Sequence, residues 1–261
     1  MTWTLATFNI NGVRARLEPL LSWLAQAAPD VLCLQEIKCQ DDQFPQAALA
    51  EAGYQAAVWG QKAYHGVAIL SRRPPQKVLK GFDDGQPLAE SRLISAQVDG
   101  VWVINTYVPQ GRDPGHPAFQ EKLAFLERLG RFLRARFQPG DRLVWLGDIN
   151  VAPQPLDVFD PERLQGQVGF HPAEQAALAQ VTAWGLSDLF RLHHPGEKQF
   201  TFWDYRLPKS FARNLGWRID HLLATAPLAQ ACRAAWVDTG PRGQEKPSDH
   251  APVLAQFELG D

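Results

Sequence analysis

The sequence predicts an α/β fold in which mixed β-sheets are covered by helices. Strand-like apolar runs alternate along the chain with segments whose apolar residues recur at helical spacing. The runs on either side of Asp99–Gly100 carry a strong hairpin signal, so we expect antiparallel neighbours there. Helical segments between other strands indicate crossover connections, which join parallel strands. Hairpins and crossovers together imply sheets of mixed direction.

The first half of the chain begins with a strand-like segment at residues 2–10, which is rich in Thr, Trp and Phe. Residues 14–28 carry leucines at helical spacing, and Pro29 ends this predicted helix. The other expected elements are a short helix at 43–52 and strands at 31–34, 54–58, 67–71, 92–98 and 101–108.

The second half contains the longest predicted helix, Pro117–Phe137, which has a long apolar stripe. Leu143–Leu146 is typical of a buried strand, and Gly147 is expected to break it. A proline-rich loop is expected at 151–170. The remaining expected elements are a helix at 172–184 and strands at 200–205, at 217–224 with Asp220 inside it, at 231–237 and at 251–259.

Size and composition set limits on the class of protein. The chain has 261 residues, 45% of them hydrophobic, and no linker, repeat or low-complexity segment, so we expect one domain over residues 1–261. We expect no membrane span and no signal peptide, since no apolar run is long enough and the N-terminus lacks the required regions. Three cysteines favour a reducing cytoplasm over a disulfide scaffold. A net charge of -2 neither indicates nor excludes a nucleic-acid partner.

A carboxylate and a carboxamide follow the strand-like run Leu143–Leu146, at Asp148 and Asn150. Side chains two residues apart in an extended backbone point to the same face. In open α/β sheets, ligands bind at the edge where such strands end. A plain turn is the alternative for this stretch alone, because Gly-Asp and Asn residues end many strands.

Polar groups of the same kind mark several other strand ends, and this common position suggests one shared site. They are Asn9, Asn11, Glu36, Asp220 and Asp249–His250. A hard cation such as Mg²⁺ prefers carboxylate oxygens. Phosphodiester hydrolysis needs a base for water, a metal on the phosphate oxygens and a donor to the developing charge. The set offers each of these parts, whereas the sequence has no Cys/His cluster of zinc spacing.

Taken singly, several of these residues have a structural explanation. Glu36 is equally explained as a solvated residue at a strand end. Asp220, if it lies inside a strand, needs a partner, since a buried lone charge costs several kcal/mol. Arg218 or Arg213 would serve as that partner in a structural ion pair. Residues 248–252 are explained as a turn before the last strand.

Seven ordered motifs carry a family resemblance over about residues 3–258. They are Phe8-Asn9-Ile10-Asn11-Gly12, Leu34-Gln35-Glu36-Ile37-Lys38, His65-Gly66-Val67-Ala68, Tyr107-Val108-Pro109-Gln110-Gly111, Gly147-Asp148-Ile149-Asn150, Arg218-Ile219-Asp220-His221 and Ser248-Asp249-His250-Ala251-Pro252. The chain resembles the bacterial exonuclease III (AP endonuclease) family of the endonuclease/exonuclease/phosphatase superfamily. The resemblance implies a DNase I-like four-layer α/β sandwich, with two mixed sheets face to face and helices outside.

The resemblance also implies roles for the polar set. Glu36 is similar to the principal Mg²⁺ ligand, with Mn²⁺ as an alternative ion, and Asn11 and Asp249 lie near a second metal position. Asp148 resembles the residue that deprotonates or orients the attacking water, steadied by Asn9. Further implied roles are phosphate donors for Asn150 and Tyr107, and a charge-stabilising dyad for His250 with Asp220.

The implied partner is double-stranded DNA, especially abasic or 3′-blocked DNA, bound by a monomer. Phe202, Trp217 and Ile219 match positions of a pocket for a flipped abasic sugar, although a role as core aromatics explains them equally well. Gly169 is expected to leave room for the abasic site. Residues expected to contact DNA phosphates are Arg92, Gln110, Lys38, Tyr64, Arg112 and Arg213.

The implied activity is Mg²⁺-dependent cleavage 5′ to abasic sites that leaves a 3′-hydroxyl, with 3′–5′ exonuclease and 3′-phosphatase activity. One alternative keeps the scaffold but acts on a lipid or other phosphoester. A second alternative is a non-catalytic nucleic-acid-binding relative. The presence of every matched acid, amide and histidine favours an enzyme over that second alternative.

Overall fold

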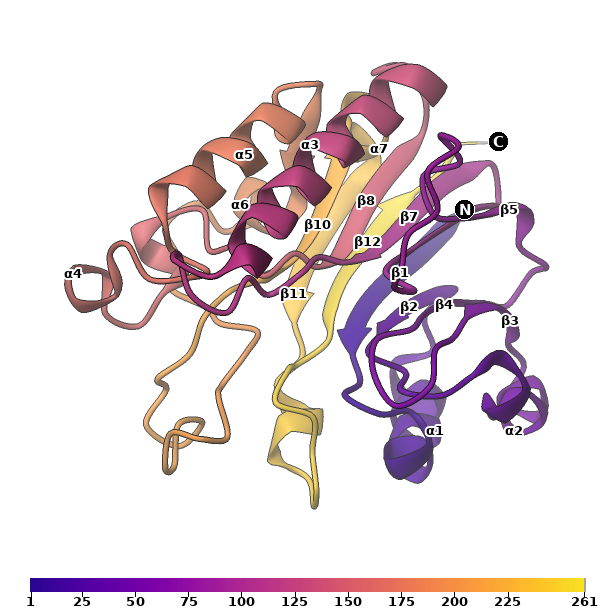
Figure 1. Ribbon diagram of the computed structural model, residues 1–261. Helices are drawn as coiled ribbons and strands as arrows, with labels where there is room; N and C mark the ends of the chain where they lie inside the picture. The colour runs from indigo at the N-terminus through magenta and orange to yellow at the C-terminus, as the bar shows by residue number, and fades with distance from the viewer. Residues whose placement is uncertain (261) are drawn as a thin grey trace.

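Two mixed six-stranded sheets pack against each other, with helices on both outer faces (Figure 1). The computed structural model describes residues 1–260, so Asp261, the last residue of the predicted domain, lies outside it. The first sheet has the order β11 (Cys232–Val237), β12 (Val253–Glu258), β1 (Thr2–Asn9), β2 (Val31–Gln35), β4 (Val67–Ser71) and β3 (Gln55–Trp59). The second has the order β5 (Gln76–Lys80), β6 (Leu93–Val98), β7 (Val101–Tyr107), β8 (Leu143–Asp148), β10 (Asp220–Thr225) and β9 (Leu186–Asp188).

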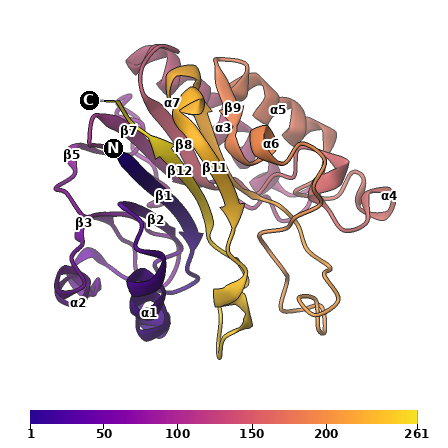
Figure 2. The same cartoon turned by 180° about the vertical axis from the view of Figure 1, so that it is seen from behind.

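Four of the helices form the two outer layers, which confirms the predicted four-layer α/β sandwich. Helices α1 and α2 lie against the first sheet, and α3 and α5 lie against the second (Figures 1 and 2). The helices are α1 (Leu17–Ala27), α2 (Gln46–Glu51), α3 (Pro117–Arg136), α4 (Pro161–Leu164), α5 (Pro172–Thr182), α6 (Leu189–His193) and α7 (Ala226–Ala231). Within residues 1–260, none of these helices has the length and apolar character that a bilayer crossing requires.

Apolar side chains fill three interfaces between the four layers. Trp3 and Ile69 of the first sheet meet Val103 and Leu146 of the second in the central core. Separate apolar clusters join each sheet to its own helices. Because side chains on a strand alternate between faces, the fully buried strands β2, β4 and β8 bury residues on both sides. This explains why these strands appear in the sequence as largely apolar runs.

The strand directions bring many chain segments to one edge of the sandwich. Parallel pairs β1–β2 and β7–β8 end there, while antiparallel β10 and β12 begin there. Asp220, the first residue of β10, stands opposite Asp148, the last residue of β8. The long loops before β10 and β12 project from the same edge (Figure 1). The polar residues predicted at separate strand ends therefore belong to one rim.

Strand β8 does not break at Gly147, contrary to the prediction. It continues to Asp148, and Gly147 pairs with Thr106 of β7. The backbone of Gly147 has a φ of 128°, and a Cβ there would lie 2.0 Å from the Thr106 carbonyl oxygen. Glycine therefore permits close strand approach instead of ending the strand.

Several other predicted boundaries are wrong. Residues 200–205 form no strand, and Phe202 makes only isolated bridges to Trp217 and His250. Strand β10 begins at Asp220 instead of 217, so Asp220 lies at a strand start and not inside it. The α-helices and strands that the sequence does not predict are β5, β9, α4, α6 and α7, all of them short.

Candidate active site

Asn9, at the end of β1, connects two carboxylates from different sheets. Its Nδ2 donates to Glu36 Oε1 at 2.9 Å and to Asp148 Oδ2 at 2.8 Å. Glu36 directly follows β2, whereas Asp148 ends β8. The Asn9 amide therefore fixes the position of the Glu36 carboxylate, from the first sheet, relative to the Asp148 carboxylate, from the second.

Oxygen ligands gather around Glu36 in a way that suits a cation. Lys38 Nζ lies 2.9 Å from Glu36 Oε2 and also donates to Asn11 Oδ1. Asn11 Nδ2 donates to Asp249 Oδ1 at 2.9 Å. A positive group thus already lies between the oxygens of Glu36 and Asn11. These residues fit a hard divalent cation, which prefers carboxylate and amide oxygens.

The charge state of Glu36 agrees with that fit. Burial raises the pKa of Glu36, but the Lys38 charge and hydrogen bonds from Asn9 and Lys38 outweigh burial. The net shift of the pKa is downward, so the carboxylate is ionised at neutral pH. Metal binding requires the deprotonated form of a ligand.

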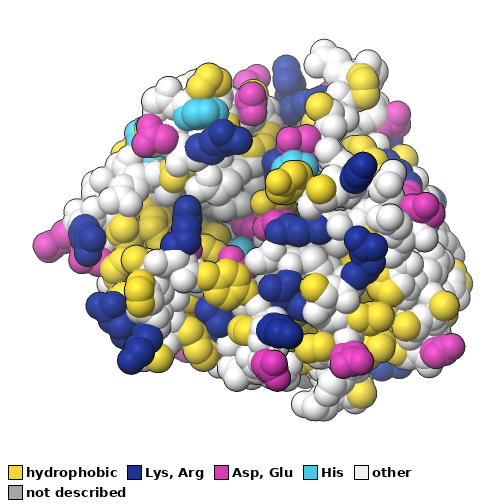
Figure 3. Space-filling model, turned by 60° about the horizontal axis from the view of Figure 1, so that its bottom comes forward, with side chains coloured by type: hydrophobic (Ala, Val, Ile, Leu, Met, Phe, Trp, Pro, Cys, Tyr) yellow, Lys and Arg dark blue, Asp and Glu magenta, His cyan; other side chains and the backbone are white. Residues whose placement is uncertain are grey.

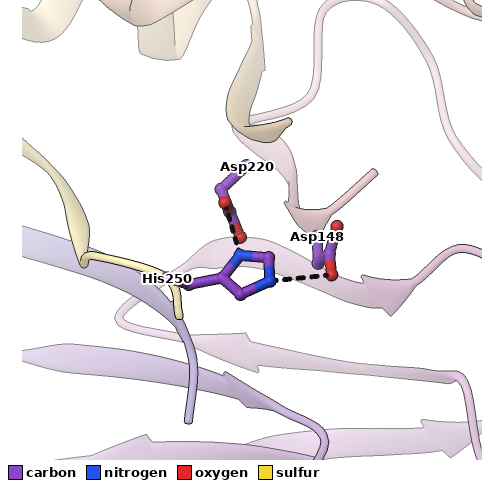
Figure 4. Close-up of side chains that lie close together, drawn as sticks. All are labelled: Asp148, Asp220 and His250. Carbon is purple, nitrogen blue, oxygen red and sulfur yellow. Dashed lines mark hydrogen bonds and ion pairs between the residues drawn. The ribbon is translucent and has the colours of Figure 1, made fainter. Parts of the chain in front are cut away.

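His250 lies between two aspartates at the floor of the site (Figure 4). Its Nδ1 is hydrogen-bonded to Asp220 Oδ2 at 2.8 Å, and its Nε2 lies 3.7 Å from Asp148 Oδ2. Asp220 is therefore partnered by His250 and not by Arg218, which pairs with Asp157 and Asp188. A carboxylate behind an imidazole fixes the ring's orientation and tautomer.

The ligand atoms of Asp148, Asp220 and His250 lie within 4.8 Å of one another, so this trio is a second candidate for metal binding. His250 Nδ1 and Asp220 Oδ2 are already committed to each other by a hydrogen bond. The trio is therefore already arranged to hold a proton, and the oxygens around Glu36 are the other candidate cation site.

The ionisation of the trio suits acid–base chemistry. Burial raises the pKa of Asp148, the His250 charge opposes this and Asp220 adds to it, giving a value of about 7. Burial lowers the pKa of His250, but the charges of Asp220 and Asp148 raise it to about 10. Near neutral pH the imidazole is thus protonated, while Asp148 is poised to accept a proton.

Asn150 and Tyr107 complete the inner surface. Asn150 has a left-handed backbone with a φ of 55°, its N–H donates to Asp148 Oδ1 at 3.0 Å and its Nδ2 donates to the Val108 carbonyl at 3.1 Å. Asn150 is thus brought beside Asp148 by a tight turn and not by the extended backbone that the sequence predicts. Burial, followed by the charges of Glu36 and Asp148, raises the pKa of Tyr107 well above its usual value, so its hydroxyl keeps its proton and can donate.

A cleft of about 1140 Å³ opens over these residues. Its floor is formed by Glu36, Asp148 and His250, and one side is apolar. Figure 3 shows this face of the molecule, with acidic and histidine side chains inside the hollow and Lys and Arg side chains around it. An anionic ligand is attracted to such a positively charged rim.

The predicted sugar-pocket residues lie on the apolar side of the cleft. Phe202, Trp217 and Ile219 pack with Phe159 into one cluster. The Phe202 ring centroid lies 4.8 Å from that of His250. The apolar wall therefore directly adjoins the polar floor.

The residues predicted to contact DNA are not equally placed. Gln110, Arg112 and Arg213 line the cleft. Tyr64 is 68% exposed, and Lys38 is held by the oxygens of Glu36 and Asn11. Gln110, Arg112 and Arg213 can therefore reach a ligand in the cleft, whereas Tyr64 and Lys38 are not among the residues that line it.

Arg92 departs from the prediction of a surface phosphate contact. It is only 8% exposed, pairs with Glu90 and donates to the Tyr107 carbonyl at 3.1 Å. Its guanidinium also lies over the Tyr107 ring, 4.7 Å from the centroid. These contacts commit Arg92 to holding Tyr107 in place.

The sequence predicted no role for two hydroxyl residues of the site, although Ser248 belongs to one of the seven motifs. Thr201 Oγ1 donates to Asp220 Oδ2 at 2.6 Å. Ser248 Oγ donates to the Asn9 carbonyl at 2.6 Å and accepts the His250 N–H at 3.2 Å. Their positions beside Phe202 and Asp249 were the available signals, but a hydroxyl next to a functional residue is too common to single out.

Comparisons with known proteins identify relatives that match nearly the whole chain. The sequence profile of the Endonuclease/Exonuclease/phosphatase family matches residues 6–250. An exodeoxyribonuclease III from Haemophilus influenzae is 36% identical over 96% of this chain and 98% of that protein. A solved AP endonuclease from Archaeoglobus fulgidus has a TM-score of 0.95 and 41% identity, covering 98% of this chain and 100% of that one. The solved 3′ phosphatase NExo from Neisseria, bound to a product DNA hairpin, has a TM-score of 0.94 and 38% identity at the same coverages.

Proposed function

The chain belongs to the Endonuclease/Exonuclease/phosphatase family, and from this premise we propose that it is a DNA-repair nuclease. The proposed reaction is hydrolysis of a DNA phosphodiester 5′ to an abasic site, which leaves a 3′-hydroxyl. The same site would remove nucleotides and phosphates from 3′ ends. The single observation that carries the proposal is the bridge from Asn9 to both Glu36 and Asp148. It holds together the two carboxylates that we propose as the cation ligand and the proton acceptor.

In the proposed mechanism, the residues of the cleft floor have separate roles in the hydrolysis of one phosphodiester. Glu36, with Asn11 and Asp249, would hold Mg²⁺ (or Mn²⁺), and a bound divalent cation neutralises charge on phosphate oxygens. Asp148 accepts a proton from the attacking water, and Asn9 keeps its carboxylate oriented.

The remaining polar groups stabilise the charge that develops on the phosphate. The Nδ1 atom of the His250 imidazolium is held by Asp220, and its Nε2 atom faces Asp148. Asn150 Nδ2 and the Tyr107 hydroxyl serve as donors to phosphate oxygens. Such preorganised donors contribute most when water is excluded, because the local dielectric is low.

The proposed substrate is double-stranded DNA with an abasic or 3′-blocked site. An abasic sugar lacks its base and fits against Phe202, Trp217 and Ile219, whereas an intact nucleotide is bulkier. Gln110, Arg112 and Arg213 line the cleft and are proposed to contact the DNA backbone. We further propose a single-domain monomer in the cytoplasm, since all three cysteines are free and buried.

Replacing Gly169 by histidine is expected to lower abasic-site cleavage. Gly169 has a φ of 88°, and a Cβ there would lie 3.3 Å from Trp217 Cζ3. An imidazole would therefore fill space beside the proposed sugar pocket. We expect kcat/KM on an abasic duplex to fall by about tenfold to a hundredfold, the range for steric discrimination in an apolar pocket.

Gly166→His is the matched control for this variant. Gly166 also has a left-handed backbone, with a φ of 79°, but a Cβ added there would meet no neighbouring atom within 4 Å. Both variants carry the same backbone strain, about 1–2 kcal/mol. Undiminished abasic cleavage by Gly169→His, or equal losses in both variants, would refute the assigned role of Gly169.

A panel of three duplexes tests the proposed function. One duplex carries an abasic site, one is blunt and one ends in a 3′-phosphate, and each is assayed with Mg²⁺ and with a chelator. We expect Mg²⁺-dependent cleavage or 3′-end removal, with a 3′-hydroxyl product. No reaction on any duplex would overturn the proposal. A phosphoinositide substrate in parallel distinguishes the lipid-phosphatase alternative, and binding of DNA without any turnover would indicate a non-catalytic relative.

A further inference from the structure

A buried ion pair lies behind the cleft and connects segments that form it. Lys122 projects from α3 and Glu174 from the first turn of α5, and neither side chain has any solvent exposure. Lys122 Nζ donates to Glu174 Oε1, to the Asn150 carbonyl at 2.7 Å and to the Gln110 carbonyl at 3.3 Å. The mechanism above uses neither Lys122 nor Glu174.

Glu174 extends this contact to the loop that faces Trp217. Its Oε2 accepts the Gly169 N–H at 2.8 Å and the His171 N–H at 3.2 Å. The Gly169 carbonyl in turn accepts the Ala152 N–H at 2.7 Å. The position of Gly169 relative to the apolar wall is thus tied to Glu174.

Stability alone does not account for this pair. Burying two charges requires desolvation of both, and well-packed apolar residues of similar size are often at least as stabilising. Here the hydrogen bonds of the two charged groups, apart from the bond between them, go to backbone groups of segments that line or flank the cleft. This pattern indicates that the pair determines how the segments around Gln110, Asn150 and Gly169 lie relative to one another.

We propose that Lys122 and Glu174 are positioning residues, which set the distance between Asn150 on the polar floor and Gly169 beside the sugar pocket. The inference rests on the function proposed above and deepens it. The pair itself touches no substrate. Its loss should therefore misplace the phosphate relative to Asp148, while Arg213, a cleft residue that the pair does not contact, keeps its position.

The double variant Lys122→Met/Glu174→Gln tests this role, because both replacements keep approximate shape and remove charge. We expect kcat on an abasic duplex to fall on the order of 10²-fold, the cost of a misplacement of about 1 Å. KM should stay within about threefold of wild type, since a loss confined to the transition state lowers kcat. The melting temperature should fall less than in Lys122→Met alone, because no unpaired charge is left buried, although the Asn150 and Gln110 carbonyls lose their donor.

Arg128→Gln/Asp84→Asn is the matched control. Arg128 lies on the same helix, and its Nε donates to Asp84 Oδ2 at 2.7 Å in an exposed pair. This control should retain wild-type kcat and KM. It shows whether losing any ion pair of α3 lowers activity.

A folded Lys122→Met/Glu174→Gln variant with kcat within about twofold of wild type would overturn the inference. If that variant does not fold, Glu174→Asp provides the test, because it keeps the charge but withdraws it from the Gly169 N–H. The same fall in kcat supports the role, and an unchanged kcat overturns it. An inactive wild-type protein would instead refute the proposed function, on which this inference depends.

Discussion

Asp148→Asn is expected to lower kcat on an abasic duplex on the order of 10³-fold, within the range for loss of a positioned base. The amide keeps the size of the carboxylate but cannot accept the proton of the attacking water. It also loses the oxygen that accepts the hydrogen bond from Asn9 Nδ2, so residue 148 is no longer held in a fixed position relative to Glu36. Single-turnover kinetics on a labelled duplex would measure the change, because they report chemistry without product release.

The Asp148→Asn variant should fold at least as well as wild type. Burial raises the pKa of Asp148, so ionising this carboxylate costs folding free energy as the pH rises above its unfolded value. A neutral amide removes that cost. Asp30→Asn serves as the control, since Asp30 accepts from the Thr4 N–H away from the cleft. A near-normal rate for Asp148→Asn would remove Asp148 from the proposed mechanism.

His250→Asn is expected to lower kcat by about 10²–10³-fold, the cost of losing one preorganised electrostatic group. The raised pKa of His250, about 10, means that the variant loses a positive charge at neutral pH. The Asn amide takes the place of Nδ1–H and can still donate to Asp220, so the fold should persist. The rate and the melting temperature together distinguish lost chemistry from lost folding.

The control for this variant is His193→Asn, which changes an exposed histidine at the end of α6. It should leave the rate unchanged. If His250→Asn turned over at the wild-type rate, the imidazolium would have no part in stabilising the phosphate. Unfolding of His250→Asn, by contrast, would assign the residue a structural role.

The layered fold and the shared edge could be predicted because both follow from local patterns. Asn9 and Asp148 end apolar strands and Glu36 directly follows one, and parallel neighbours necessarily end at the same edge. The family motifs then related His250 to Asp220, and their side chains are indeed hydrogen-bonded. The roles assigned to these residues stay predictions until they are measured.

Features that depend on distant contacts could not be predicted in the same way. The aromatic run at residues 200–205 matches a strand in composition, but its backbone makes only isolated bridges. Arg92 has the sequence character of a surface cation, and its burial depends on Glu90 and Tyr107. Lys122 lies among apolar helix residues, and only the folded chain reveals Glu174 beside it.

The measurement that tests the central claim most directly compares Asp148→Asn, His250→Asn and the double variant in single-turnover cleavage of an abasic duplex. The claim is that both side chains act on one phosphate in one cleft. Residues that act as a unit show strongly non-additive losses. We therefore predict that the double variant is within about threefold of the slower single variant. Multiplication of the two single losses would contradict a shared reaction centre.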